Sequence, residues 1–191
     1  MLSGISAVLL PGADLDNAVL DLGAVLPGLV GEQFEIIVVT AEDGLTDDLR
    51  ARAPGLPLRQ VSGDTIADGC DAASFDLIFV SAEDRQFDVS ELNHLLEAIE
   101  KGADVAAGYR PRAIDTFLRH LQRWGLDLNV DCVSQLLRTT VWLTLRNQRQ
   151  TASCAERLST LRRLGFLVTE VPVRQRRAAL GTAGSAPSRA A

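Results

Sequence analysis

Three short apolar runs, separated by segments of helical spacing, constrain the fold of this chain most strongly. The runs cover residues 5–11 (ISAVLLP), 34–40 (FEIIVVT) and 75–81 (FDLIFVS), and they are rich in β-branched residues. Short, nearly continuous apolar runs are typical of strands that are buried on both faces. Residues 17–29 and 64–74 lie between these runs and have the spacing of helices. Strands that alternate with helices predict an α/β fold, with a mostly parallel sheet and helices on both faces.

The rest of the chain continues the alternation. We expect a weak strand at 57–63, a helix at 90–101 that Ser90 caps, and a strand at 103–110. Further segments are predicted as an amphipathic helix at 113–126, a strand followed by a helix or strand at 130–145, a helix at 154–166 and a terminal strand at 167–176. We therefore expect a single domain over residues 1–177. Residues 178–191 are small and polar, which predicts a flexible C-terminal tail.

Composition excludes several classes of protein. The chain has 191 residues, 47% of them hydrophobic, which suits a folded globular domain. Its net charge of -6 argues against a nucleic-acid binder, because such proteins usually carry a basic balance. The apolar runs are too interrupted for a signal peptide or a membrane span, so we expect a cytoplasmic protein. Three widely spaced cysteines and two histidines offer no zinc-ligand spacing.

Polar side chains follow three of the predicted strands, at the point where each strand ends. Asp14 and Asp16 follow the first, and Thr40, Glu42 and Asp43 end or follow the second. In an open α/β sheet, ligands bind outside the carboxyl ends of the strands. The strand predicted at 75–81 ends in Ser81, and the most acidic group follows it: Glu83, Asp84 and Asp88. The sequence therefore predicts a ligand site at this edge of the sheet.

Four stretches, taken in order, carry a resemblance to a known family. They are ISAVLLPGADLDN at the start, FDLIFVSAEDRQFDVSEL followed by the 103–110 strand, CVSQLLRTTVW, and ERLSTLRRLGFLVTEVPVRQRR near the end. In this order the chain resembles family 2 glycosyltransferases of the GT-A fold. Within that family it is most similar to the polyprenyl-phosphate, or dolichol-phosphate, mannosyl- and glucosyltransferase type. The resemblance covers about residues 3–182.

The resemblance implies transfer of a hexose from a nucleotide-diphospho-sugar to a lipid phosphate, such as polyprenyl phosphate, or to another small acceptor. It implies that Glu83 and Asp84 bind Mg²⁺ or Mn²⁺, which balances the charge of the donor diphosphate. Asp131 would act as the catalytic acid on the acceptor side. The substrate-binding positions that it implies are Pro11, Asp14, Asp16, Thr40, Glu42, Asp43, Ser81, Arg110 and Arg176.

The chain departs from the family pattern at its polar positions. The metal-binding Asp-x-Asp motif becomes Ser81-Ala82-Glu83, and the acidic pair that ends the second strand becomes Thr40-Ala41. Two hypotheses therefore stay open: an active transferase, and a non-catalytic GT-A pseudoenzyme that binds or regulates a partner. A nucleotidyltransferase is disfavoured, because LLPGADLDN lacks the glycine-rich, basic loop that such enzymes need.

Simpler structural roles compete with several of these assignments. Asp14, Asp16 and Asp88 suit helix caps or turns, Arg110 suits an exposed surface position, and Glu83 with Asp84 suits a solvated turn. Phe117 and Trp124, on the basic helix predicted at 113–126, favour the core over peripheral contact with a membrane. A protein partner and a homo-oligomer are further alternatives that the sequence leaves open.

Overall fold

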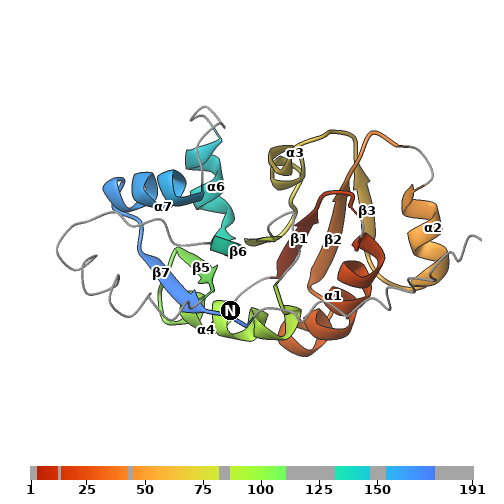
Figure 1. Cartoon of the computed structure of the whole chain (residues 1–191), viewed down its shortest axis with the longest axis horizontal. Helices are drawn as coiled ribbons and strands as arrows, with labels where there is room; N and C mark the ends of the chain where they lie inside the picture. The colour runs from red at the N-terminus through yellow and green to blue at the C-terminus, as the bar shows by residue number, and fades with distance from the viewer. Residues whose placement is uncertain are drawn as a thin grey trace, which may run out of the picture.

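The computed structural model describes residues 4–12, 14–42, 45–81, 87–110, 132–146 and 154–174. Within these ranges the chain forms one sheet whose strands alternate with helices (Figure 1). The strands are β1 (Ile5–Leu9), β2 (Phe34–Val39), β3 (Leu58–Val61), β4 (Leu77–Ser81), β5 (Val105–Tyr109), β6 (Cys132–Arg138) and β7 (Val168–Pro172). The helices are α1 (Leu15–Val30), α2 (Leu45–Arg52), α3 (Ile66–Asp71), α4 (Leu92–Glu100), α6 (Thr139–Leu145) and α7 (Cys154–Arg163), with a short 3₁₀ helix η1 (Val89–Glu91) before α4.

The sheet has the order β3-β2-β1-β4-β6-β5-β7. All neighbouring strands pair in parallel except β6, which runs antiparallel to both β4 and β5. The chain therefore moves outward from β1 to β3 and then returns to place β4 on the other side of β1. This is the point at which the strand order reverses, and such a point opens a crevice at the carboxyl ends of the strands.

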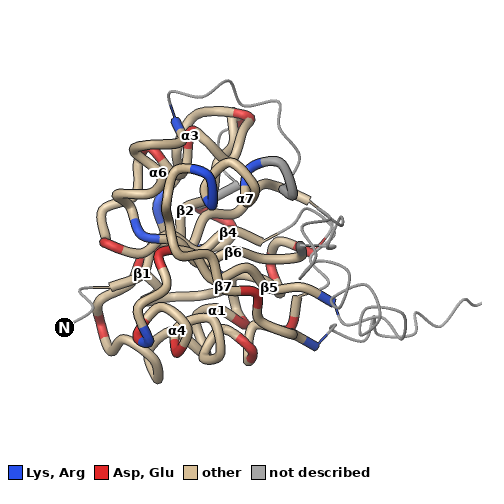
Figure 2. Tube along the Cα trace, turned by 90° about the vertical axis from the view of Figure 1, so that its left-hand side faces the viewer, with Lys and Arg blue, Asp and Glu red and all other residues tan. Residues whose placement is uncertain are grey.

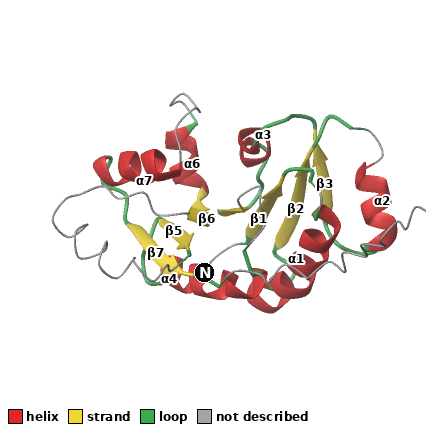
Figure 3. Ribbon diagram, viewed as in Figure 1, coloured by secondary structure: helices red, strands yellow, loops and turns green. Residues whose placement is uncertain are grey.

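Helices cover both faces of the sheet (Figures 1 and 3). The helices α1, α2 and α4 contribute to a core on one face, and α3, α6 and α7 contribute to a core on the other. Neighbouring residues of a strand belong to opposite cores: Ile36 and Val38 of β2 pack with the first group of helices, and Ile37 and Val39 with the second. The continuous apolar runs of the sequence follow from this two-sided burial. The strands at the middle of the sheet carry few charged residues, and most of the charged residues lie in the helices and loops around them (Figure 2).

One buried polar network connects the amino-terminal ends of the strands. Ser6 of β1 donates a hydrogen bond of 2.7 Å to the Glu35 carboxylate, and Glu35 also accepts one of 2.7 Å from the Ser74 backbone N–H. Arg59 of β3 forms an ion pair with Glu35, with 3.2 Å between Nε and Oε2. Because Glu35 is only 9% exposed, its charge needs these partners. The network joins β1, β2 and β3 to the turn that precedes β4.

The predicted fold class is confirmed, and so is the order of strands and helices within the described ranges. The cap predicted at Ser90 is wrong, the cap role predicted for Asp88 is confirmed, and Asp14 takes the N-cap position of α1 without a side-chain cap. The Asp14 side chain accepts a hydrogen bond from Asn17 instead of capping the backbone of α1. Ser90 lies inside η1, and Asp88 caps that turn by accepting from the Ser90 backbone N–H at 3.0 Å. The helix predicted at 113–126 and the tail at 178–191 lie outside the described residues.

Candidate functional site

A cavity of about 580 Å³ opens at the carboxyl ends of the central strands. This volume is within the range of small-molecule sites in proteins. The wall is contributed by the ends of β1, β2 and β4, by the turn after β3 and by the start of α3. The described residues that line it are Leu9, Leu10, Pro11, Val39, Thr40, Ala41, Glu42, Gly63, Asp64, Ile66 and Ser81. We call this cavity the switch-point pocket, because it lies beside the neighbouring strands β1 and β4, between which the strand order reverses.

Hydrogen bonds within the chain fix the side of the pocket formed by the end of β2. Thr40 is 3% exposed, and its hydroxyl accepts a hydrogen bond of 3.0 Å from the Glu42 backbone N–H. The Gln60 side chain donates a second bond, of 3.1 Å, to the Glu42 carbonyl oxygen. The backbone of this loop is therefore held from two directions. The Glu42 side chain is exposed, and the backbone that carries it is held in place by these two hydrogen bonds.

The opposite wall begins at the turn between β3 and α3, where a capping box formed by Thr65 and Asp68 stabilises the start of the helix. The Asp68 carboxylate accepts hydrogen bonds from the Thr65 hydroxyl (2.8 Å), the Thr65 N–H (3.0 Å) and the Asp64 N–H (3.2 Å). These bonds, led by the one from the Thr65 hydroxyl, lower the pKa of Asp68 below its ordinary value. Asp68 therefore stays ionised to lower pH than an ordinary aspartate, and its carboxylate contacts the backbone of Asp64 in the pocket wall.

Gly69 allows α3 to approach the strands closely. A Cβ atom at this position would lie 2.3 Å from Cγ1 of Val8 and 2.6 Å from Cγ2 of Val39. Since Val39 also lines the pocket, the same glycine sets the distance between α3 and the pocket wall. The neighbouring Cys70 is buried, and burial together with the Asp71 charge raises the pKa of its thiol to about 12. This thiol is therefore protonated at neutral pH and unsuited to act as a nucleophile.

Four of the predicted substrate-binding residues line the switch-point pocket: Pro11, Thr40, Glu42 and Ser81. They come from three separate segments of the chain. Three lining residues were not predicted from the sequence: Gly63 and Asp64 in the turn after β3, and Ile66 at the start of α3. The signal for them was the weak strand predicted at 57–63, because parallel strands end at the same edge of a sheet.

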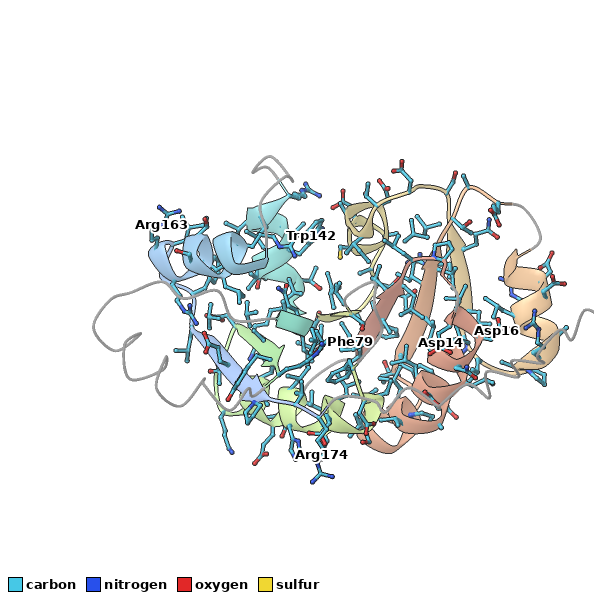
Figure 4. All side chains as sticks on the ribbon, in the orientation of Figure 1. Asp14, Asp16, Phe79, Trp142, Arg163 and Arg174 are labelled. Carbon is cyan, nitrogen blue, oxygen red and sulfur yellow. The ribbon has the colours of Figure 1, made fainter. Side chains whose placement is uncertain are left out.

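The other predicted site residues divide into two groups. Asp14 and Asp16 are not among the described residues that line the pocket. They lie at the start of α1, where Asp14 bonds to Asn17 and Asp16 pairs with Arg52 of α2 (Figure 4). Arg110 is half-buried just after β5 and likewise does not line the described pocket wall. The remaining residues lie outside the described ranges: Asp43, Glu83, Asp84, Asp131 and Arg176.

The two ends of the acidic loop that carries Glu83 and Asp84 are themselves described. Ser81 ends β4 and lines the pocket. Phe87 is buried, and its ring packs against that of Phe79, with 5.5 Å between the ring centroids. The loop therefore begins in the pocket wall and returns to the core on the face that α1 and α4 cover.

The described part of the pocket does not form a metal site by itself. No group of three or more His, Cys, Asp or Glu side chains that could hold a metal ion occurs in the described ranges. Ser81 contributes a hydroxyl group at the position where the family pattern has a carboxylate. A hydroxyl is a weaker ligand for Mg²⁺ or Mn²⁺ than a carboxylate.

A second hollow, of about 540 Å³, lies between α4 and β7 at the side of the sheet, away from the switch point. His94, Glu97 and Lys101 contribute to its wall, and the last two form an ion pair of 2.7 Å. Nearby, the buried Glu91 carboxylate contacts Nδ1 of His94 at 3.1 Å and Nε of Arg174 at 3.5 Å. These contacts connect the start of α4 to the end of β7, which is a structural role.

None of the helices in the described ranges has both the length and the apolar composition that crossing a membrane requires.

No protein-family model matches the chain. No curated protein matches its sequence either. Solved structures do match the fold. One is 4-diphosphocytidyl-2C-methyl-D-erythritol synthase from Anaerococcus prevotii, which is 14% identical with a TM-score of 0.62, over 90% of this chain and 88% of that one.

Two glycosyltransferases are also similar in structure. The mannosyltransferase from Pyrobaculum calidifontis in complex with GDP-Man and Mn²⁺ is 13% identical with a TM-score of 0.66, over 88% of this chain and 54% of that one. The glucosyl-3-phosphoglycerate synthase from Mycobacterium tuberculosis, in complex with Mn²⁺ and UDP-glucose, is 16% identical with a TM-score of 0.56. That match covers 93% of this chain and 73% of that one. The fold of this chain is thus the mostly parallel α/β fold of nucleotide-diphospho-sugar transferases, the GT-A-like fold.

Proposed function

We propose that this chain is a glycosyltransferase-like protein that transfers a hexose from a nucleotide-diphospho-sugar to a lipid phosphate or another small acceptor. The observation that carries the proposal is the switch-point pocket. It lies where open α/β sheets bind nucleotide ligands, and Pro11, Thr40, Glu42 and Ser81 line it together. Fold alone does not assign a function, so the proposal depends on this site as well as on the fold.

In the proposed reaction, an oxygen atom of the acceptor forms a bond to the anomeric carbon of the hexose. The bond from that carbon to the donor diphosphate breaks, and the nucleoside diphosphate leaves. A phosphate acceptor is already ionised, so the step needs no strong general base. We propose Asp131 as the acceptor-side acid, and Arg110 and Arg176 as partners of the phosphate groups. Asp14, Asp16 and Asp43 are proposed as further substrate-binding residues.

The narrower assignment is family 2 of the glycosyltransferases, and within it the polyprenyl-phosphate type. The resemblance of the sequence supports this assignment. The structural similarity to a mannosyltransferase bound to GDP-Man and a synthase bound to UDP-glucose is consistent with a nucleotide-sugar donor. A polyprenyl-phosphate acceptor would also bring the chain into peripheral contact with a membrane. We propose a single catalytic domain over residues 1–177, a cytoplasmic location, and no nucleic-acid partner.

A divalent metal, Mg²⁺ or Mn²⁺, is part of the proposal only through Glu83 and Asp84. The described residues of the pocket do not fit a metal ion on their own, because Ser81 replaces a carboxylate and no three-ligand group is present among them. The two glycosyltransferase structures named above contain Mn²⁺.

A second candidate function is a non-catalytic binding module on the same fold. Ser81 and the Thr40-Ala41 pair favour it, because they replace acidic residues of the family pattern while the strands and cores persist. This candidate predicts nucleotide binding that is absent or indifferent to metal. Its partner would be another protein or a second copy of the chain.

Calorimetric titration of the full chain with UDP- and GDP-hexoses, in Mn²⁺ and separately in EDTA, tests the transferase. We expect binding that requires Mn²⁺ and that Glu83→Ala weakens. Glu32→Ala is the matched control, because Glu32 is an exposed glutamate just before β2, at the opposite end of that strand from the pocket. Release of nucleoside diphosphate on addition of a polyprenyl phosphate would then identify the acceptor class. Failure of every donor to bind in Mn²⁺ would contradict the proposal.

A further inference from the structure

The hollow between α4 and β7 lies at an outer edge of the molecule. β7 is the last strand of the described sheet, and it lies beside α4 on the face turned to the viewer in Figure 2. Three buried residues line the hollow, Ala98, Ala103 and Val171, and none of them is more than 9% exposed. Leu167 lines it as well, and at 56% it is the most exposed of the large hydrophobic residues that the structure describes. An apolar recess beside an exposed apolar side chain is typical of a surface that contacts another macromolecule.

The carboxylates and the lysine that line this hollow are already paired within the chain. Glu97 of α4 and Lys101 at the end of that helix form an ion pair of 2.7 Å, and Glu170 of β7 forms one of 2.6 Å with Arg162 of α7. A charged small molecule would have to compete with these contacts. The lining therefore favours an apolar partner surface over an ionic ligand.

The end of β7 disfavours one common mode of association, the addition of a strand to the edge of a sheet. β7 has five residues, and the last of them is Pro172, which is exposed and lines the hollow. Proline has no backbone N–H to donate, and on edge strands it prevents pairing with another chain. A partner would therefore contact this surface through side chains.

The charges at the end of α4 are self-complementary. Glu97 is acidic, Lys101 is basic, and they are exposed one turn apart on the helix. A two-fold axis between them reverses the direction of the helix in a second copy, so each glutamate faces the lysine of the other copy. Ala98 lies between the two in the lining of the hollow, and its small side chain lets the two helices approach. This pattern favours a second copy of the chain over an unrelated partner.

We propose that two copies of the chain associate through the α4–β7 hollow in a two-fold symmetric contact. Leu167 of each copy enters the hollow of the other, and Glu97 and Lys101 form ion pairs between the copies. This hollow and the switch-point pocket share no described lining residue, so the contact leaves that pocket open. The inference is independent of any donor or acceptor, and it assigns a surface to the homo-oligomer that the sequence leaves open.

Sedimentation velocity of the full chain over a wide range of concentration tests the association. We expect a species of twice the 20.5 kDa mass of the chain, which dissociates on dilution. Leu167→Lys should weaken the association by about tenfold or more, because it places a charge in an apolar contact. Leu20→Lys is the matched control, since Leu20 is an exposed leucine of α1, none of whose residues is among the described lining of the hollow. Thermal unfolding midpoints verify that both variants are folded.

A pair of charge-reversing variants tests the two-fold arrangement and leaves Leu167 in place. Glu97→Lys and Lys101→Glu each put like charges opposite one another, so each variant alone should associate about tenfold more weakly than the unchanged chain. A mixture of the two variants should associate about as tightly as the unchanged chain, because two positive charges then face two negative ones. No ion pair within a single chain can produce this recovery, since each variant carries two like charges on its own helix.

Three results would overturn the inference: a chain that stays monomeric at every concentration, a dimer that Leu167→Lys weakens no more than Leu20→Lys does, or charge-reversed variants that associate no better when mixed. The first would leave a different protein as the partner of the hollow, and the second would mean that the copies meet at another surface. The third would exclude the two-fold arrangement of α4. The proposed function is tested separately, by donor titration, so each conclusion stands or fails without the other.

Discussion

Ser81 is the pocket residue at which the chemistry of this chain can be tested most directly, because it has a hydroxyl group where the family that the sequence resembles has a carboxylate. It ends β4, and the acidic loop with Glu83 and Asp84 follows it directly in sequence. Hard divalent cations prefer carboxylate oxygens. If Glu83 or Asp84 supplies one ligand, a carboxylate at position 81 would supply the second.

We therefore predict that Ser81→Asp strengthens the binding of a UDP- or GDP-hexose in Mn²⁺ by roughly tenfold, the scale on which single groups tune metal sites. In EDTA the same variant should weaken UDP binding, because it adds a negative charge to an acidic pocket. Calorimetry of both conditions provides the measurement. Ser81→Asn is the control, since it has nearly the same shape as aspartate without the charge. Equal behaviour of the Asp and Asn variants would argue against a metal at this edge of the sheet.

At the scale of elements, the contact between α3 and the strands depends on Gly69. The helix lies over β1 and β2, and a Cβ atom at position 69 would come within 2.6 Å of Val8 and Val39 side-chain atoms. Such contacts force the helix or the strands to shift. Since α3 also supplies Ile66 to the pocket wall, a shift of this helix would change the pocket as well.

We predict that Gly69→Ala lowers the free energy of unfolding by about 1–3 kcal/mol, as overpacking of a close contact does. The control is Gly28→Ala in α1, because a Cβ atom there would meet nothing within 4 Å. That change should be neutral or stabilise the protein by up to about 1 kcal/mol, since alanine favours a helix over glycine. Urea denaturation measures both. A cost for Gly69→Ala no larger than that for Gly28→Ala would show that α3 is free to move.

The strands and helices were largely predictable, because a strand that is buried on both faces has a nearly continuous apolar sequence. Residues 34–40 read as a continuous apolar run, and β2 is buried along its whole length. The direction of β6 was not predictable, because a buried antiparallel strand shows the same apolar pattern as a parallel one. The cap at Ser90 was predicted wrongly because Asp88, two residues earlier, also suits a cap and forms it in the structure.

The site was predictable in part, for a geometric reason. Residues that follow parallel strands meet at one edge of the sheet, so Pro11, Thr40, Glu42 and Ser81 could be expected near one another. Asp14 and Asp16 follow the same strand as Pro11, but α1 begins there and directs them to Asn17 and Arg52. A position just after a strand was thus enough to predict that a residue lies at this edge of the sheet. Whether its side chain reaches the pocket depends on whether a helix begins at that residue.

At the scale of the whole molecule, one sheet joins two cores that form on its opposite faces. Helices from both halves of the chain contribute: α1 and α4 to one core, and α3 and α7 to the other. The Trp142 indole N–H of α6 donates a hydrogen bond of 2.7 Å to the Asp71 carboxylate at the end of α3, so the two halves also meet outside the sheet (Figure 4). Cores that share every central strand should unfold together.

We predict that a chain truncated after Arg177 unfolds in a single transition, with a midpoint within about 2 °C of the full chain. The removed residues, 178–191, have the small polar composition of a segment that adds nothing to a hydrophobic core. The described cores end at Val173, which belongs to the core that contains α1 and α4. Thermal unfolding, followed by calorimetry and by circular dichroism, makes the comparison, and coincident transitions from both methods identify two-state behaviour. A second transition would mean that residues 1–177 contain more than one folding unit, and a midpoint lowered by more than about 5 °C would mean that the last residues stabilise the fold.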